Sequence, residues 1–461
     1  MWTKKRYEAP KSSRRVGGEF RALKWTARHP GSVLVPATLT ASGIELGWAT
    51  TGGIIGGTAA GLCTWYRAHP DTFDYYAAPR MRAWRRRWSV YFGPKFNKAL
   101  RACDLYTTDR KTGQEWFPRV VRVRSYSPSV DTITLSLAPG QGRRSFDDKL
   151  EILADTLRVE RIAIERPKPG YVALIVERSE PFTETIPAPE MPEESDAVDP
   201  GDIYIGETEY GSEWRQGVGS QHIFIAGATG AGKNSVVLAI LRGLAPLIRD
   251  GKVRLWICDP KQLEFAKLAG VAYRYADDEG RCAELVDEYL EDLRAVQRMF
   301  ASTGKRKITM SRETPLNILI LDEIGALLAY GDGTIGRALR KNLAIVGSQG
   351  RATGHSMIAA VQEPTKDTVP IRELFPVRIC MRVTAQSHVD MVLGDGSRLR
   401  GALADEIPNI EETAGIGYVI RQKTRTPIRV RAAYTDDGDI DDLVAFIRSG
   451  WTGESRLTVV A

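Results

Sequence analysis

A glycine-rich run in the middle of the chain has the composition of a loop that binds phosphate. It reads Gly227-Ala-Thr-Gly-Ala-Gly-Lys233, follows an apolar stretch and precedes a helical pattern from Ser235 to Ile248. Glycines let backbone N–H groups turn towards phosphate oxygens, and the amino end of the following helix adds partial positive charge. Lys233 would reach the β and γ oxygens of a nucleotide. The sequence therefore predicts an ATP site built from Gly227, Ala228, Thr229, Gly230, Ala231, Gly232, Lys233, Asn234 and Ser235.

The residue after Lys233 departs from the usual phosphate-loop pattern. A Ser or Thr that ligates Mg²⁺ normally stands there, whereas this chain has Asn234 and places Ser235 one residue later. Either the side-chain carbonyl of Asn234 or the hydroxyl of Ser235 could bind the metal, and we favour the hydroxyl. The alternative is a loop that no longer hydrolyses ATP, in which case the protein would be a nucleotide-gated scaffold.

Two further apolar runs end in residues that could serve the same site. The run Leu316 to Leu321 is followed by Asp322 and Glu323, and SMIAAVQ ends on Gln362. We expect Asp322 to hold Mg²⁺, Glu323 to orient the attacking water, and Gln362 to sense the γ-phosphate. The alternatives are an exposed acidic turn for the carboxylates and a solvent-facing loop for Gln362. A third run ends in Asp259-Pro260-Lys261 without an assigned role.

The elements that must position these residues alternate along the chain. Between 203 and 434, apolar runs that resemble buried strands alternate with helical patterns, which predicts an α/β ATPase domain with a parallel sheet flanked by helices. Before it, 119–184 reads as two strands, a helix and two strands, a small α+β domain. The acidic, proline-rich residues 185–202 are typical of a linker, and 435–461 form a C-terminal tail.

The N-terminal region predicts an association with a membrane. A basic segment, 1–30, precedes an apolar segment, 31–66, in which Glu45 is the one charged residue, and a basic connector, 67–118, follows. We expect 31–66 to form a membrane hairpin or a single pass, with the ATPase body in the cytoplasm and the protein at the cell membrane. The alternative is a buried, glycine-rich helical pair in a soluble domain.

The overall composition restricts the class of protein. The chain has 461 residues, of which 43% are hydrophobic and 26% charged, so it has enough apolar residues for several packed domains. The formal net charge of +7 permits a polyanionic partner. Five scattered cysteines without a CxxC pair argue against a zinc site or a disulfide framework.

Several sequence blocks resemble the FtsK/SpoIIIE family of DNA translocases. They are HIFIAGATGAGK, DPKQLEF, ILILDE, GRATGHSMIAAVQEP and PVRICMRVTAQSHVDMVLG. The resemblance covers roughly 120–434 and implies a RecA-like P-loop ATPase core. It further implies a homo-hexameric ring that hydrolyses ATP with Mg²⁺ at subunit interfaces and moves double-stranded DNA, held mainly by its phosphate backbone. Hydrolysis at an interface needs an arginine in trans; Arg378 is the candidate, with Arg351 and Arg382 as rivals.

Finer features of this resemblance suggest a role in DNA transfer. The displaced serine after Lys233 is similar to that in short FtsK-like plasmid or integrative-element transfer (Tra) proteins of actinobacteria. The expected function is therefore conjugative transfer, with other transfer proteins as partners. We do not expect the winged-helix module that reads DNA orientation after residue 434. The alternative is an FtsK-like ATPase for protein secretion, although such proteins usually join several ATPase modules and one P-loop is visible here.

Overall fold

The computed structural model describes residues 30–91, 93–109, 111–219, 221–330, 332–421 and 425–450. The chain forms two compact units, residues 1–78 and residues 79–461. Of the predicted basic segment 1–30, all but Pro30 lies outside the described residues, as does the end of the predicted tail from 451.

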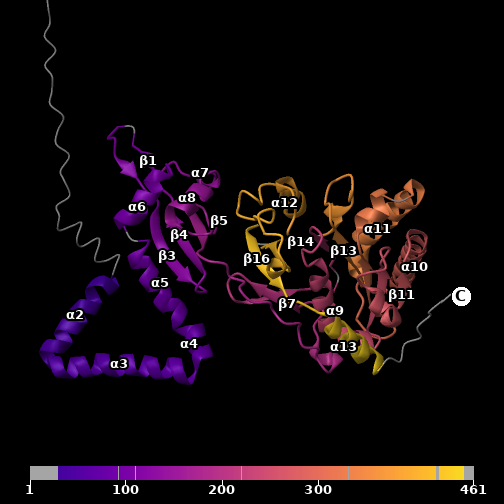
Figure 1. The fold of residues 1–461 in the computed structure, drawn as a ribbon, viewed down its shortest axis with the longest axis horizontal. Helices are drawn as coiled ribbons and strands as arrows, with labels where there is room; N and C mark the ends of the chain where they lie inside the picture. The colour runs from indigo at the N-terminus through magenta and orange to yellow at the C-terminus, as the bar shows by residue number, and fades with distance from the viewer. Residues whose placement is uncertain are drawn as a thin grey trace, which may run out of the picture. The chain divides into compact units, whose positions relative to one another are not determined.

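The first unit consists of helices with mostly exposed side chains. They are α2 (Pro30–Glu45), α3 (Trp48–Ala68) and α4 (Pro70–Tyr76). The first two meet at an angle in Figure 1, at the break that Gly47 makes with a φ of 84°. Among the described residues, no helix is both long enough and apolar enough to cross a bilayer. The predicted membrane segment 31–66 thus finds no support, because α2 has 16 residues and glycines and threonines make α3 insufficiently apolar.

The second unit begins with a small α+β region whose four-stranded sheet is antiparallel throughout. The strand order is β3-β4-β6-β5, and the core beneath one face is formed with α6 and α8. The elements are α5 (Ala78–Ser89), α6 (Gly93–Ala102), β1 (Thr107–Thr108), β2 (Glu115–Trp116), β3 (Arg119–Ser125), β4 (Val130–Ser136), α7 (Arg144–Asp147), α8 (Leu150–Leu157), β5 (Arg161–Glu165) and β6 (Tyr171–Glu177). The order of the four main strands, with helix between the second and the third, agrees with the pattern that the sequence predicts for 119–184.

The segment 185–202, predicted as a linker, lies along the ATPase domain. Ile186 is buried and its carbonyl accepts a hydrogen bond from the backbone N–H of Tyr434. Lys252 binds the hydroxyl of Ser195, which is in the short helix η1 (Ser195–Ala197). Apolar side chains spaced among the prolines allow this packing, which the acidic composition does not indicate.

The ATPase domain is built around a ten-stranded, mostly parallel sheet, as the sequence predicts. Its strand order is β11-β10-β12-β13-β9-β14-β15-β16-β7-β8. The strands from β11 to β14 in this order run parallel, whereas the neighbours from β14 to β8 pair antiparallel. The strands are β7 (Ile203–Thr208), β8 (Glu213–Gln216), β9 (Ile223–Ala226), β10 (Val253–Cys258), β11 (Arg274–Ala276), β12 (Leu316–Leu321), β13 (His355–Val361), β14 (Val377–Met381), β15 (Ile416–Ile420) and β16 (Pro427–Ala432).

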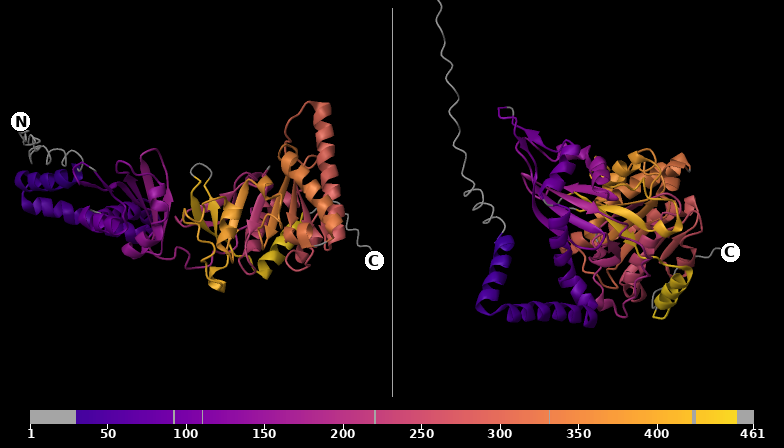
Figure 2. Two further views of the ribbon diagram at one scale, coloured as in Figure 1. Left: turned by 90° about the horizontal axis from the view of Figure 1, so that it is seen from above. Right: turned by 60° about the vertical axis from the view of Figure 1, so that its left-hand side comes forward.

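Helices cover both faces of the large sheet (Figures 1 and 2). The long helices α9 and α13 share one hydrophobic core with the sheet, whereas α10 and α11 share the other. The helical elements are α9 (Lys233–Arg249), η2 (Ala266–Val271), α10 (Glu279–Thr303), the π-helix η3 (Ala326–Tyr330), α11 (Gly333–Thr353), η4 (Arg372–Leu374), α12 (Gln386–Leu393), η5 (Glu411–Thr413) and α13 (Asp437–Arg448). Helix α13, within the predicted tail, buries Leu443 and Ile447 against this domain.

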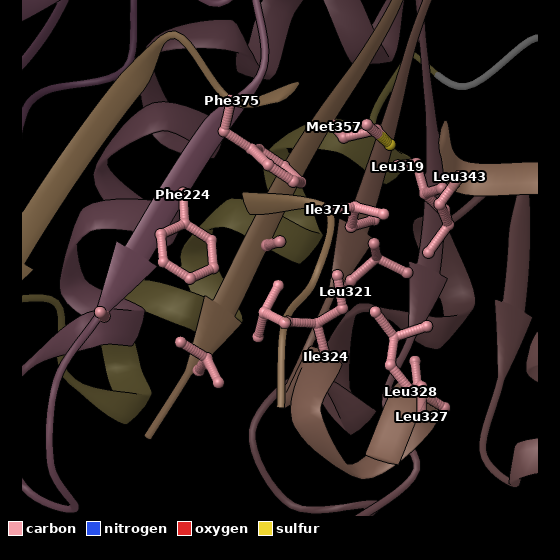
Figure 3. Packing of buried hydrophobic residues seen from close by; sticks show 14 of the residues in the cluster. Phe224, Leu319, Leu321, Ile324, Leu327, Leu328, Leu343, Met357, Ile371 and Phe375 are labelled. Carbon is pink, nitrogen blue, oxygen red and sulfur yellow. The ribbon is translucent and has the colours of Figure 1, made fainter. Parts of the chain in front are cut away.

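Alternating side chains of the central strands fill the two cores. In β9, Ile223 and Ile225 point to the α9 side, whereas Phe224 points to the α10 side and packs beside Phe375. Figure 3 shows Phe224 and Phe375 in the same core as Leu321 and Ile324. Fully burying such a side chain contributes roughly 1.5–3 kcal/mol each. This packing fixes the strand ends from which the candidate site is built.

Candidate nucleotide site

The glycine-rich loop joins the carboxyl end of β9 to the amino end of α9. Gly230 and Gly232 adopt left-handed backbone conformations, with φ of 73° and 87°. A Cβ on Gly232 would lie 2.4 Å from the backbone N of Gly415, so a close backbone approach requires glycine here. The loop is further held by the N–H of Ala228, which donates to the carbonyl of Arg382 over 2.7 Å. The backbone therefore has the turn and the helix start that phosphate binding requires.

Lys233 is the first residue of α9, and its ammonium folds back over the loop. Its Nζ donates to the carbonyl oxygens of Gly227 and Ala228 over 2.8 and 3.3 Å. Burial lowers the pKa of Lys233, while the nearby carboxylates of Glu323 and Asp322 act in the opposite direction. A cation thus lies at the mouth of the loop, where the phosphates of a nucleotide would bring compensating negative charge.

Asn234 and Ser235 occupy successive positions in the first turn of α9. Both are half-buried, and neither side chain makes a hydrogen bond with a described residue. The helix turns by about 100° per residue, so the two side chains point in directions that differ by that angle. One of them, and not both, can face a metal ion bound at the loop. Which of the two does so stays a prediction.

Asp322 and Glu323 follow β12 directly, and both are buried. Burial, reinforced by the charge of Asp259, raises the pKa of Asp322 to about 6. Glu323 has a φ of 48°, a conformation that a residue with a side chain rarely adopts, and such strain clusters at functional sites. Its Oε1 accepts the backbone N–H of Gln362 over 3.1 Å. The structure therefore holds the two carboxylates in distinct environments beside the phosphate loop.

Gln362 connects the carboxylate pair to the loop. It follows β13, which lies between β12 and β9 in the sheet. While its backbone binds Glu323, its Oε1 accepts the hydroxyl of Thr229 over 3.2 Å. Lys233, Asp322, Glu323 and Gln362, predicted separately, thus lie together because the carboxyl ends of parallel strands share one sheet edge.

Two residues that the sequence left without a role also belong to this edge. The ammonium of Lys261 lies 3.3 Å from Oε2 of Glu323. Asp259, at the end of β10, accepts hydrogen bonds from the N–H of Phe265 and the hydroxyl of Tyr275. The other oxygen of Asp259 is buried and makes no hydrogen bond with a described residue. The sequence signal for these two residues was Asp259-Pro260-Lys261, which follows a predicted strand as Asp322 and Glu323 do.

The oxygen donors at this edge suit Mg²⁺. Magnesium is usually held by one or two carboxylates together with substrate phosphates, hydroxyls and water. Asp322 supplies a buried carboxylate, and Asn234 or Ser235 supplies a neutral oxygen. Among the described residues, no group of three or more His, Cys, Asp or Glu side chains is placed to hold a metal ion. The donors fit a metal that binds together with a nucleotide.

The three candidate arginines occupy different places. Arg382 lies beside its own phosphate loop and is mostly buried, and its Nη2 donates to the carbonyl of Thr229 over 2.6 Å. Arg378 lies near the amino end of β14 and forms an ion pair of 2.7 Å with Glu373. Burial lowers the pKa of His222, just before β9, and the nearby charge of Arg351 lowers it further. Arg351 and Arg378 thus lie towards the edge of the sheet opposite the loop.

A cavity of about 1270 Å³ lies at that opposite edge. Arg372, Glu373 and Arg378 line it, and no residue of the phosphate loop does. The cavity is therefore separate from the candidate nucleotide site.

Comparison with known proteins places the site in a family context. Residues 200–403 match the model of the FtsK/SpoIIIE family. The DNA translocase FtsK of Streptococcus agalactiae is 22% identical over 346 residues, which cover 70% of this chain and 40% of that protein. FtsK of Bacillus cereus is 24% identical over 325 residues, covering 64% of this chain and 38% of the relative. The chain therefore spans about two fifths of the length of these curated relatives.

Solved structures with a similar arrangement have low sequence identity. The pCW3 conjugation coupling protein TcpA, in a monomer form with ATPγS, is 18% identical with a TM-score of 0.48, covering 76% of this chain and 97% of that one. The cytoplasmic domain of the type VII secretion ATPase EccC of Thermomonospora curvata is 18% identical with a TM-score of 0.43, covering 60% and 33%.

Proposed function

We propose that the chain is an ATP-hydrolysing motor that moves double-stranded DNA, because residues 200–403 match the model of the FtsK/SpoIIIE family. One observation carries the proposal. Gln362 is hydrogen-bonded both to Thr229 of the phosphate loop and to Glu323, the residue after Asp322, at one edge of a parallel sheet. The FtsK relatives, which carry the name of DNA translocases, support DNA as the substrate that is moved.

The residues of the site have distinct roles in this proposal. The loop N–H groups and Lys233 hold the phosphates of ATP, and Asp322 with Asn234 or Ser235 holds Mg²⁺. A Mg²⁺ ion held by these residues would supply positive charge beside the phosphates. Glu323 accepts a hydrogen bond from the attacking water and orients it towards the γ-phosphate. Gln362 reports the γ-phosphate to Glu323, because its backbone and side chain contact both Glu323 and the loop residue Thr229.

We further propose that the protein acts as a homo-hexameric ring. Hydrolysis then uses an arginine from the neighbouring subunit to stabilise charge in the transition state. Arg382 already supports its own phosphate loop, so we retain Arg378 for the role in trans, with Arg351 as its rival. The finer biological role, conjugative transfer of a plasmid or an integrative element with other transfer proteins, rests on the displaced Ser235. A cell-membrane location with the ATPase body in the cytoplasm stays a prediction.

The proposal is tested by the steady-state ATPase rate of the full chain, with and without linear duplex DNA, across a salt series. A DNA motor should be stimulated by duplex, and the stimulation should decrease at high salt because binding releases counterions from the phosphates. Lys233→Ala should abolish turnover, and Glu323→Gln should lower kcat by about 10²–10⁴-fold while ATP still binds. Turnover that is indifferent to DNA would favour protein secretion, and no turnover at all would favour the nucleotide-gated scaffold.

A further inference from the structure

The four-stranded sheet of the small α+β region has one face that does not belong to its helical core. The helices α6 and α8 cover the face that carries Ile133 and Leu135. On the other face, the β5 and β6 side is buried. Val130, Ala163 and Ile175 cluster there, with Tyr210 of the ATPase domain packed against them. A Cβ on Gly401 would lie 2.6 Å from the Cβ of Ala163, so the ATPase domain touches this side directly.

The β3 and β4 side of the same face is open and carries a grid of polar side chains. Arg119, Arg122 and Arg124 of the edge strand β3 are exposed. They pair with Ser136, Thr134 and Thr132 of β4, respectively, which are half-buried. Residues directly opposite in an antiparallel pair point to the same face, so arginines and hydroxyls alternate across this surface.

A β-bulge produces this alignment. Arg119 and Arg122 are three residues apart, and in a regular strand their side chains would point to opposite faces. The register between β3 and β4 shifts between Val120 and Arg122, which inserts one extra residue and returns Arg122 to the face of Arg119. The strand thereby gathers three arginines on one face.

The charge of this surface is positive and uncompensated by its own strands. The one carboxylate in β3 and β4 is Asp131, which is buried and binds Arg86 and Arg178. Arg119 and Arg122 form no ion pair or hydrogen bond with the described residues, and Arg124 donates to the hydroxyl of Tyr126 over 2.9 Å. Two of the three guanidinium groups therefore have their donors available to a partner.

Arginine and Ser/Thr hydroxyls are among the side chains that contact the phosphates of nucleic acids, independently of sequence. Alternate residues along a strand are about 6.7 Å apart, which gives a regular row of donors along an edge. We propose that Arg119, Arg122, Arg124, Thr132, Thr134 and Ser136 form a surface that binds the phosphate backbone of duplex DNA. The inference rests on the proposed function and adds to it a DNA contact outside the nucleotide-binding edge. A lipid bilayer is a less suitable partner for this surface. A membrane-binding surface carries apolar side chains that insert between the lipids, whereas Ser and Thr hydroxyls lie beside these arginines.

The test is the affinity of the full chain for a short blunt-ended DNA duplex as a function of salt. The variant Arg119→Gln, Arg122→Gln, Arg124→Gln removes three charges from the surface. If each arginine neutralises one phosphate, the slope of log K against log salt falls by about 2.7, and affinity near 0.1 M salt falls on the order of 100-fold. The matched control, Lys95→Gln, Lys98→Gln, Arg144→Gln, removes the same charge from exposed positions on α6 and α7, elements that contribute to the core beneath the opposite face.

The outcomes separate this inference from the proposed function. A reduced slope in the arginine variant alone, with thermal unfolding and sedimentation as in the wild type, supports the inference. If the arginine variant binds DNA like the control while duplex stimulates the ATPase of the wild type, the proposed DNA contact on this surface is wrong and the proposed motor function is retained. If the arginine variant instead loses ring assembly, the face is a contact between subunits. A wild type that neither binds nor responds to duplex overturns both proposals.

Discussion

Two glycines of the phosphate loop allow the packing of this loop to be tested separately from its backbone conformation. Gly230 and Gly232 both have positive φ, so an alanine at either position costs about 1–2 kcal/mol in backbone strain. At Gly230 the new Cβ would meet nothing within 4 Å, whereas at Gly232 it would lie 2.4 Å from the backbone N of Gly415. Gly415 cannot yield easily, because its N–H donates to Ala231 and its carbonyl accepts from Ala432.

The contact should therefore add an overpacking cost at Gly232 alone. With about 1–3 kcal/mol for that cost, Gly232→Ala should destabilise the protein by roughly 2–5 kcal/mol, against about 1–2 kcal/mol for Gly230→Ala. The two variants should differ in Tm by roughly 2–12 °C. The assay is thermal unfolding of the full chain, followed by titration with ATP and Mg²⁺, for which Gly232→Ala should show the larger loss of affinity. Equal Tm values for the two variants would refute the contact between the loop and Gly415.

Three further changes test the charges around the site and beneath the small sheet. Burial raises the pKa of Asp322 from 3.8 to about 6, so the folded chain holds that proton more tightly than the unfolded chain and loses stability as pH rises through this range. Asp322→Asn should therefore stabilise the nucleotide-free protein at pH 8 by up to about 3 kcal/mol, measured by denaturant unfolding. The same variant should lose Mg²⁺-dependent turnover. An unchanged free energy of unfolding would contradict the burial of the Asp322 carboxylate. Lys261→Met removes the cation beside Glu323. It should lower kcat by up to about 10²-fold, with little change in the Kd for ATP. An unaltered kcat would show that this ion pair does not position Glu323. Arg161→Met leaves the buried carboxylate of Glu209 without its partner and should cost about 3–5 kcal/mol in unfolding experiments, so a cost below about 1 kcal/mol would argue against the pair.

The central strands and their terminal residues were predictable because their signals are local. A continuous apolar run such as Leu316 to Leu321 indicates a buried strand, and the parallel arrangement then brings its end beside those of β9 and β13. The contacts of Gln362 with Glu323 and Thr229 agree with that reasoning. The mostly parallel α/β fold followed from the same alternation of strands and helices.

The antiparallel extension of the sheet was not predictable from such runs. It pairs β7 with β16, and Gly206 lies so close to Arg431 that a Cβ would clash with the carbonyl oxygen of that residue. These partners are distant in sequence, and no local pattern indicates which strands pair. The ion pair between Lys261 and Glu323 was missed for the same reason, because the two residues are 62 positions apart in the sequence. The packing of 185–202 likewise depends on single apolar residues within an acidic segment.

The contact between the phosphate loop and Gly415 also has a consequence for protein synthesis. The loop at Ala231 leaves the ribosome long before Gly415, whose N–H donates to the carbonyl of Ala231, and before Ala432, whose N–H donates to the carbonyl of Gly415. At about 5–20 residues per second, the roughly 200 intervening residues take about 10–40 s to synthesise. During that time β9 lacks its neighbours β13 and β14, which are also translated later, so its apolar edges stay unpaired. During this period the unpaired strand of the nascent chain is exposed and could be bound by chaperones. The nucleotide site, which needs the later strands, forms among the last parts of the domain.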